Sequence, residues 1–197
     1  MAHEKPYGVY APSVAGAHNP NKSMIRFCQG DPCMLENSCS SVLTRDLIHA
    51  IHVKGGVVHI PAGYDAVVGA YEGDDGLTYV ILPEGMRCIG ERAFSCCGRL
   101  EGINIPSSVI AIGDYALSSC HELKEIALPL GVKRVGKCAF AHCDGLRRLS
   151  LPPSIEEIGE DAFIGCSSDL VYEVEAGSFA HRYLQLLHLP RVTLRVW

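Results

Sequence analysis

A 23-residue period between residues 57 and 176 constrains the fold of this chain more than any other feature. Proline, glycine and cysteine recur at this interval over four consecutive turns, in register with columns of alanine, leucine and isoleucine. The marker columns are Pro83, Pro106, Pro129 and Pro152; Gly90, Gly113, Gly136 and Gly159; and Cys97, Cys120, Cys143 and Cys166. An imperfect turn precedes them, so the sequence predicts about five turns, each of which packs on its neighbours.

Each turn contains a segment that predicts a β-strand. These segments are LEGINIP (100–106), LKEIALP (123–129) and LRRLSLP (146–152). Apolar and polar residues alternate along them with the period of two of a strand, and a proline, which has no amide donor, ends each one. Strands of this form in repeats of about 20 to 29 residues are typical of leucine-rich repeats. The sequence therefore predicts an α/β repeat fold, a leucine-rich-repeat solenoid with parallel strands on its concave face.

The turn IGERAFSCCGRLEGINIP (89–106) resembles the BspA-like, treponemal type of leucine-rich repeat. In that family the usual turn reads Ile-Gly-x-x-Ala-Phe-x-x-Cys-x-x-Leu-x-x-Ile-x-Leu-Pro. The resemblance covers residues 57–176, and the closing segment is similar to the helix-strand cap of the family. It implies the same solenoid fold. It also implies a role in protein binding or cell adhesion, because BspA-like proteins are often bacterial surface adhesins or host-interaction proteins, including virulence factors.

The ends of the chain differ from the repeats. Residues 1–36 show no periodicity and predict an irregular extension. Residues 37–56 predict a capping helix, centred on 40–53, that would cover the first turn of the solenoid at 57–176. Residues 177–197 predict a C-terminal cap, a helix followed by a strand, in which Ser178 is a good N-cap and Ala180, Tyr183, Leu184 and Leu187 share one helical face.

Composition narrows the class of partner. The formal net charge is −5 and the pI is about 6.0, which gives no cationic field for nucleic acid. No apolar run is long enough for membrane insertion, and the first residues lack the order of a secretory signal. We therefore expect a monomer that is either cytoplasmic or an exported protein expressed without its signal.

The cysteine column raises the question of redox or metal chemistry. Identical positions on adjacent turns lie about 4.8 Å apart, whereas a disulfide needs Cβ atoms about 3.8 Å apart. The column cysteines are therefore expected to remain buried thiols, and Cys88, Cys96 and Cys138, which lie off the column, to be partly exposed. The sequence contains no recognisable catalytic or cofactor-binding motif, which predicts a protein that is not an enzyme and needs no cofactor.

A second group of potential ligands precedes the repeats. It consists of Cys28, Cys33, Cys39, His49 and His52. These residues could supply a zinc site, but the spacing fits no common zinc module. A disulfide among the three cysteines, or no special role, are the alternatives.

The outward positions of the strands predict the binding surface. They include Val57, His59, Tyr79, Ile81, Glu101, Lys124, Glu125, Arg147 and Arg148. Val57, Tyr79 and Ile81 form an apolar zone, which either binds a partner or is covered by the N-terminal extension. The charged zone either binds or neutralises itself through the pairs Glu101 with Lys124 and Glu125 with Arg148.

The leading hypothesis is a non-enzymatic protein-interaction module that uses the concave face, with Tyr79 and Ile81 as anchors and Arg147 and Arg148 as polar partners. Two alternatives remain open at this stage. One is a metal- or redox-responsive protein that uses the N-terminal cysteines and histidines, and the other is a structural protein that self-associates through an edge of the solenoid.

Overall fold

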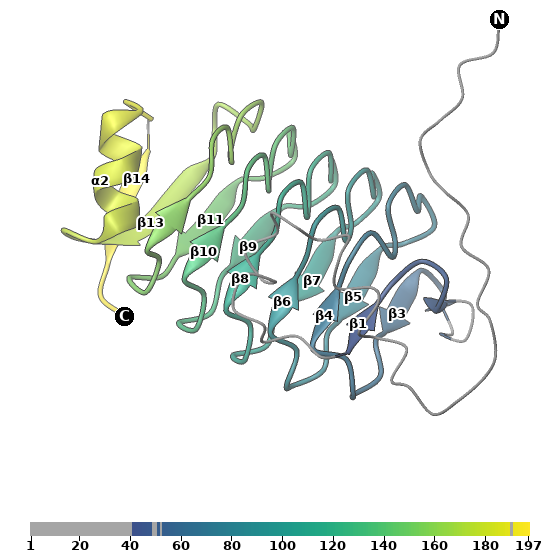
Figure 1. The fold of residues 1–197 in the computed structure, drawn as a ribbon. Helices are drawn as coiled ribbons and strands as arrows, with labels where there is room; N and C mark the ends of the chain where they lie inside the picture. Colours follow the sequence, from purple (N-terminus) through teal and green to yellow (C-terminus); the bar gives the residue numbers. More distant parts are fainter. Residues whose placement is uncertain (1–40, 49–50, 52, 190) are drawn as a thin grey trace, which may run out of the picture.

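The computed structural model describes residues 41–48, 51, 53–189 and 191–197, which form a solenoid of short parallel strands (Figure 1). Each regular turn crosses two sheets and returns through a tight irregular segment. The predicted leucine-rich-repeat fold is confirmed. The longest sheet contains six strands, one more than the five turns that the sequence predicts.

The longest sheet, sheet A, has six parallel strands of two residues each. In spatial order they are β1 (Val42–Leu43), β4 (Ala66–Val67), β6 (Cys88–Ile89), β8 (Ala111–Ile112), β10 (Arg134–Val135) and β12 (Glu157–Ile158). The second residue of each strand points into the core, as the burial of Leu43, Ile89 and Val135 shows. The sequence interpretation treated this half of the turn as a return segment and did not predict these strands.

The concave face consists of two sheets of four strands. One contains β2 (Val53–Lys54), β3 (Val57–His59), β5 (Tyr79–Ile81) and β7 (Gly102–Asn104), and the other contains β9 (Glu125–Ala127), β11 (Arg148–Leu151), β13 (Val171–Glu175) and β14 (Val192–Arg195). All neighbours pair in parallel except β2 and β3. The predicted strands are present, and each is shorter than its sequence segment.

The irregular side of each turn is also hydrogen-bonded to the next turn. The amide of Phe94 donates to the carbonyl of Ala116 at 2.9 Å, and the amide of Phe140 donates to that of Ala162 at 2.9 Å. On this side of the solenoid, two residues in every turn adopt the left-handed backbone conformation, with positive φ. They are Gly69, Arg92, Tyr115, Cys138 and Asp161 at the first position and Gly73, Cys96, Ser119, His142 and Gly165 at the second. Non-glycine residues tolerate this conformation here because the inter-turn bonds offset its steric cost of about 1–2 kcal/mol per residue.

The glycine column is explained by close approach of successive turns. A Cβ atom on Gly159 would lie 2.5 Å from the amide nitrogen of Lys137, and one on Gly136 would lie 2.6 Å from that of Asp114. Any larger residue would force adjacent turns apart and weaken the bonds between them.

Aromatic rings fill the centre of the core, where the turns stack. Tyr71 and Phe94 stack with their centroids 5.7 Å apart, and Phe140 and Phe163 stack at 6.1 Å. Leu117 occupies the same column between the two pairs and is fully buried. The column therefore continues through the turn in which leucine replaces the aromatic residue.

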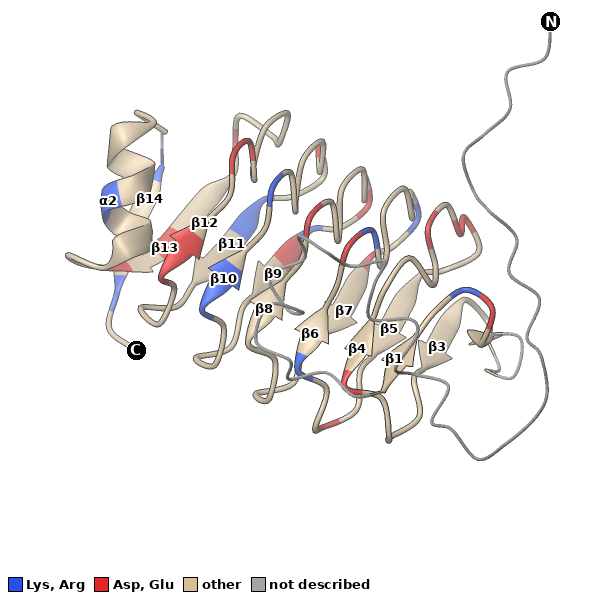
Figure 2. Cartoon of the chain, in the orientation of Figure 1, with Lys and Arg blue, Asp and Glu red and all other residues tan. Residues whose placement is uncertain are grey.

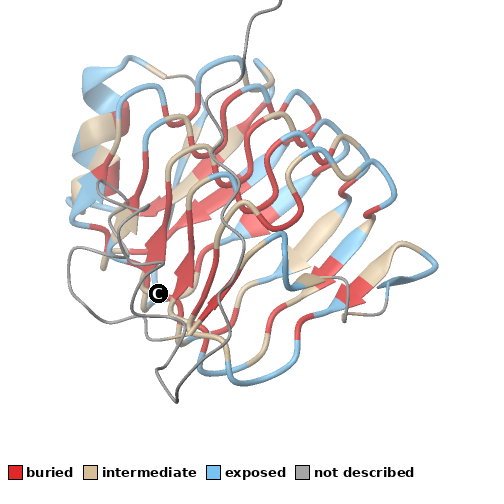
Figure 3. Cartoon of the chain, turned by 45° about the vertical axis from the view of Figure 1, so that its right-hand side comes forward, coloured by how far each residue is buried: buried red, intermediate tan, exposed pale blue. Residues whose placement is uncertain are grey.

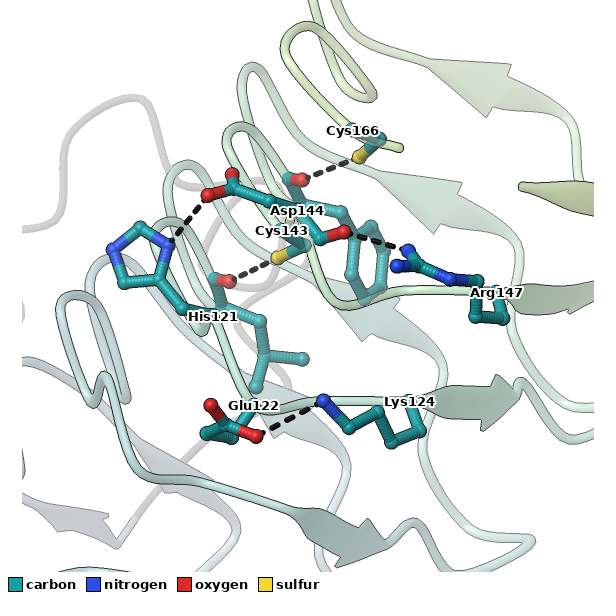
Figure 4. Close-up of polar contacts among 9 residues, drawn as sticks. His121, Glu122, Lys124, Cys143, Asp144, Arg147 and Cys166 are labelled. Carbon is teal, nitrogen blue, oxygen red and sulfur yellow. Dashed lines mark hydrogen bonds and ion pairs between the residues drawn. The ribbon is translucent and has the colours of Figure 1, made fainter. Parts of the chain in front are cut away.

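The column cysteines form a ladder of hydrogen bonds along the core. Each thiol donates to a carbonyl of the preceding turn: Cys97 to Tyr71 at 3.0 Å, Cys120 to Phe94 at 3.3 Å, Cys143 to Leu117 at 3.1 Å and Cys166 to Phe140 at 3.1 Å. Figure 4 shows the last two of these bonds. All four remain unbridged, as predicted; Cys97, Cys120 and Cys143 are buried, whereas Cys166, in the last repeat, is only half-buried. Of the three cysteines off the column, Cys96 is exposed and Cys138 half-buried, but Cys88 is fully buried, so its expected exposure was wrong.

The C-terminal cap is the predicted helix and strand. Helix α2 (Phe179–Leu186) begins at Ser178, whose hydroxyl accepts from the amide of His181 at 3.1 Å, and it stands beside β14 at the end of the solenoid (Figure 1). Ala180 and Leu184 are buried, whereas Leu187, the C-cap residue that follows the last helical residue, is 51% exposed.

The N-terminal cap differs from the prediction. Val42 and Leu43, which the periodicity placed on a helix, form β1 and pair with Ala66 and Val67 of β4. The amides of a helix cannot extend a parallel sheet, so pairing with β4 overrides the local helical pattern. The other residues of the predicted helix that the structure describes form turns or the short strand β2.

We predict that the ladder thiols do not react in the folded protein. Burial raises the pKa of the Cys97 thiol to about 12, that of Cys143 to about 12 and that of Cys166 to about 11, and it also raises the pKa of Cys120. Alkylation at about pH 8 followed by peptide mass spectrometry should label Cys96 and leave Cys97, Cys120 and Cys143 unlabelled until denaturant is added. Labelling of Cys120 as fast as Cys96 in the native protein would contradict the ladder.

Candidate interaction face

The outward residues of the concave face form two columns across the strands. The first column runs through Val57, Tyr79 and Gly102 on one sheet and through Glu125, Arg148 and Val171 on the other. The second column begins with His59, Ile81 and Asn104. Successive side chains in a column lie on neighbouring strands and can contact each other or a shared ligand.

Near the N-terminal end lies an apolar patch, defined as Val57, Tyr79 and Ile81. A Cβ atom on Gly102 would lie only 2.5 Å from the Cε2 atom of Tyr79, so the tyrosine ring rests against the glycine of the next strand. Tyr79 remains 41% exposed, and Ile81 and Val57 are half-buried. His59 is exposed beside Ile81. The glycine thus makes room for a large ring that rests against the neighbouring strand and remains partly exposed.

Toward the C-terminal end lies an ionic cluster, defined as Glu125, Arg148, Ser150, Glu173 and Arg195. The charges alternate across β9, β11 and β13, with acidic, basic and acidic residues in turn (Figure 2). Arg148 contacts Glu125 at 3.4 Å and Glu173 at 3.5 Å, while Arg195 contacts Glu173 at 2.7 Å. The predicted pair of Glu125 and Arg148 is therefore present as part of a larger network.

Glu173 is the centre of the ionic cluster. Its carboxylate accepts a hydrogen bond from the buried hydroxyl of Ser150, and only 17% of its side chain is exposed. The Ser150 bond is the main reason that the pKa of Glu173 lies below its usual value, although partial burial opposes this, and Arg195 and Arg148 lower it further. The cluster thereby ties the cap strand β14 to the last repeats.

Three of the predicted face residues lie at the rim instead. Glu101, Lys124 and Arg147 come directly before the strands, where the chain leaves the turn. Lys124 contacts Glu122 at 2.9 Å, so the predicted pair with Glu101 is wrong, and the Arg147 guanidinium donates to the carbonyl of Asp144 at 2.7 Å (Figure 4). The reason is that the strands begin one residue later than the outward register assumed.

Sequence reasoning missed two residues of this face. Gly102 seats Tyr79, and Arg195 reaches Glu173 from the cap. The signal for Gly102 was available, because glycine stands there in a column otherwise filled by larger residues. Arg195 had no such signal, because the cap lies outside the 23-residue period.

The candidate metal site that precedes the repeats is not tested by the described residues. The proposed metal ligands Cys28, Cys33, Cys39, His49 and His52 lie outside the part of the chain that the structure describes. Within that part, no three histidine, cysteine or acidic side chains come together so as to hold a metal ion. His121 and Asp144 form an exposed pair at 3.2 Å on the rim. No helix among the described residues has the length and apolar character needed to cross a membrane.

The solenoid with an outward-facing strand surface defines a leucine-rich-repeat protein. Residues 68–190 match the family described as BspA type leucine-rich repeat region, in six copies, and the chain belongs to this family. The six copies agree with the six strands of sheet A better than with the five turns expected from the sequence. Leucine-rich repeats are generally protein-interaction modules and generally not enzymes.

Solved structures show the same fold. A leucine-rich repeat protein of T. pallidum is 32% identical with a TM-score of 0.58, and the match covers 62% of this chain and 59% of that one. A leucine-rich cell surface protein of Faecalibacterium prausnitzii is 27% identical with a TM-score of 0.57, and the match covers 65% of this chain and 34% of that one. A leucine-rich repeat protein of Bacteroides ovatus is 24% identical with a TM-score of 0.59, and the match covers 71% of this chain and 42% of that one. The matches thus span between a third and three fifths of these proteins. No functionally curated protein matches the sequence.

We predict that Glu173→Gln makes the free energy of unfolding less dependent on pH in the acidic range. The lowered pKa of Glu173 means that its contribution to stability is present above the usual carboxyl value of 4.5 and is lost as pH falls through the lower folded value. Urea unfolding should therefore show wild type more stable than Glu173→Gln at about pH 7, with the difference shrinking toward about pH 3. A difference that stays constant over this range would show that the Glu173 charge does not stabilise the cap.

Proposed function

We propose that this protein is a non-enzymatic interaction module that binds a protein partner on its concave face, with the apolar patch as the main anchor. The observation that supports this most is the placement of Tyr79, a large ring held against Gly102 on a strand and 41% exposed. Aromatic residues in such positions concentrate binding energy, because little rotamer freedom is lost when they are covered.

The ionic cluster has a secondary role in this proposal. Its carboxylates and guanidinium groups already satisfy one another across β9, β11, β13 and β14. A partner would have to replace these contacts, so the cluster would set orientation and selectivity more than affinity. The same reasoning removes Arg147 from the expected polar partners, because its guanidinium donates to backbone carbonyls at the rim.

The partner surface that fits this face has two parts. An apolar or aromatic side chain would pack on Tyr79 and Ile81 of β5, and polar groups would lie over Glu125 and Arg148, two and three strands away. The F. prausnitzii relative is described as a cell surface protein. We include in the proposal that this protein, too, acts at a bacterial cell surface, where it would contact another protein.

The double variant Tyr79→Ser with Ile81→Ser tests the anchor. A partner isolated with the full chain should bind this variant at least about 30-fold more weakly, the effect of losing about 2 kcal/mol at a hot spot. Thermal unfolding should change little, because both side chains point away from the core. Binding can be measured by surface plasmon resonance or calorimetry.

The matched control is Leu130→Ser with Ile164→Ser. These residues are also large, apolar and exposed, at 59% and 48%, but lie outside the strands of the concave face. The control should retain wild-type affinity. Equal affinity of all three proteins, or a loss confined to the control, would contradict the proposal.

A further inference from the structure

A seam between β7 and β9 divides the concave face. The two strands belong to consecutive turns and lie next to each other, yet they are part of different sheets. Where the chain enters β7, the amide of Glu101 donates to the carbonyl of Thr78 in the preceding turn at 2.8 Å. At the entry to β11, the amide of Arg147 likewise donates to the carbonyl of Lys124 at 2.7 Å. Within the part of the chain that the structure describes, no such bond joins Lys124 to Glu101 or any residue of β9 to β7.

The same two turns are bonded to each other on their other sides. Along sheet A, β8 pairs with β10, and the amide of Lys133 donates to the carbonyl of Ile110 at 2.8 Å. On the irregular side, the amide of Leu117 donates to the carbonyl of Ala139 at 2.9 Å. Because hydrogen bonds hold the turns together on these two sides, the turns are free to separate only on the concave face.

The core beneath the seam is less covered than the core elsewhere. Strand β7 contains no buried residue, whereas β5, β9 and β11 each contain at least one (Figure 3). Ile103 of β7 is half-buried, although Val80 and Ile126, at the same position of the neighbouring strands, are 0% and 4% exposed. Ile105 is also half-buried, whereas Leu128 in the next turn is 1% exposed. Residues of the core register stay accessible here because the next strand does not close over them.

Asn104, the last residue of β7, gives a reason for the seam. Its side-chain Oδ1 accepts a hydrogen bond from the amide of Leu82 at 2.7 Å. At the equivalent place between β9 and β11 the acceptor is a backbone carbonyl, because the amide of Leu128 donates to the carbonyl of Ser150 at 3.0 Å. The asparagine side chain thus takes the place of the β7 backbone in the contact with β5. The end of β7 is then not fixed in the orientation that pairing with β9 requires.

We propose that the solenoid bends at this seam, with the paired strands β8 and β10 as the hinge and with Asn104 keeping β7 apart from β9. The concave face then consists of two halves that move relative to each other. The half with β5 carries the apolar patch, and the half with β11 carries the ionic cluster, so bending changes the distance between the two. This consequence for partner binding rests on the proposed function, whereas the hinge rests on the backbone hydrogen bonds alone.

Two NMR measurements on the full chain test the hinge without a partner, so their outcome is separate from that of the binding experiment. In native-state hydrogen exchange, the amides of Lys124 and Glu125 should exchange at least about 100-fold faster than those of Glu101 and Arg147, which are bonded to the preceding turn. Residual dipolar couplings measure the bending itself. The amides of β3, β5 and β7 should fit a different degree of alignment from those of β9, β11 and β13.

Asn104→Ala removes the side-chain acceptor, so that Leu82 must use the backbone carbonyl of β7 as its acceptor. This variant should slow the exchange of the Lys124 and Glu125 amides at least about tenfold and bring both halves to one degree of alignment. The matched control is Ser108→Ala, which removes another side-chain oxygen that accepts a backbone amide of the preceding turn, that of Gly85 at 3.0 Å. The control should behave as the wild type.

Two results would overturn the proposal. One is slow exchange of the seam amides in the wild type together with a single degree of alignment, which would show that the two turns do not separate. The other is fast exchange and two degrees of alignment that persist in Asn104→Ala, which would show that Asn104 does not keep β7 apart from β9. Unreactive Cys97 and Cys120 should show that each variant is folded.

Discussion

The structure depends on the backbone hydrogen bonds that join each turn to the next. These bonds run along all three sheets and also along the irregular side, where the described residues form no regular strand or helix. A turn of 23 residues has too few apolar side chains to form a core by itself, so it is stable only when its neighbours satisfy its polar groups and cover its apolar ones. The glycine column, the left-handed residues and the spacing of the turns all follow from keeping these bonds short.

The core chemistry follows from the same stacking. A thiol at the cysteine position can reach a carbonyl of the preceding turn that the strands leave available, so cysteine combines a small apolar volume with one weak donor. Stacked rings at the aromatic position use the inter-turn spacing in the same way. Both columns are therefore structural, whereas the outward side chains of the concave strands are not held by these contacts between turns.

The period allowed much of this to be predicted from sequence. It located the concave strands, the buried cysteines and the outward position of Tyr79, because a repeated residue must occupy a repeated environment. It failed where the environment is not repeated or not local. Val42 and Leu43 fit a helical pattern, but the open edge of β4 determines their conformation. The prediction placed Lys124 on the concave face, but β9 begins one residue later, at Glu125, so Lys124 lies at the rim.

Two surface features could not be derived from the pattern at all. The contact of Arg195 with Glu173 depends on how the cap folds back on the last repeat. The apolar outer residues of sheet A lie on strands of only two residues, and a pattern of two residues is too short to be recognised as a strand in the sequence. Both features emerge only when the turns are placed in three dimensions.

Native-state hydrogen exchange tests the central claim most directly, because it reports on each inter-turn bond separately. The account predicts that the amides of Phe94, Leu117 and Phe140 on the irregular side exchange as slowly as strand amides such as those of Ile126 and Leu149, since all are released by the same separation of turns. Exchange of the irregular-side amides at the rate of an unstructured peptide, while the strand amides stay protected, would contradict it.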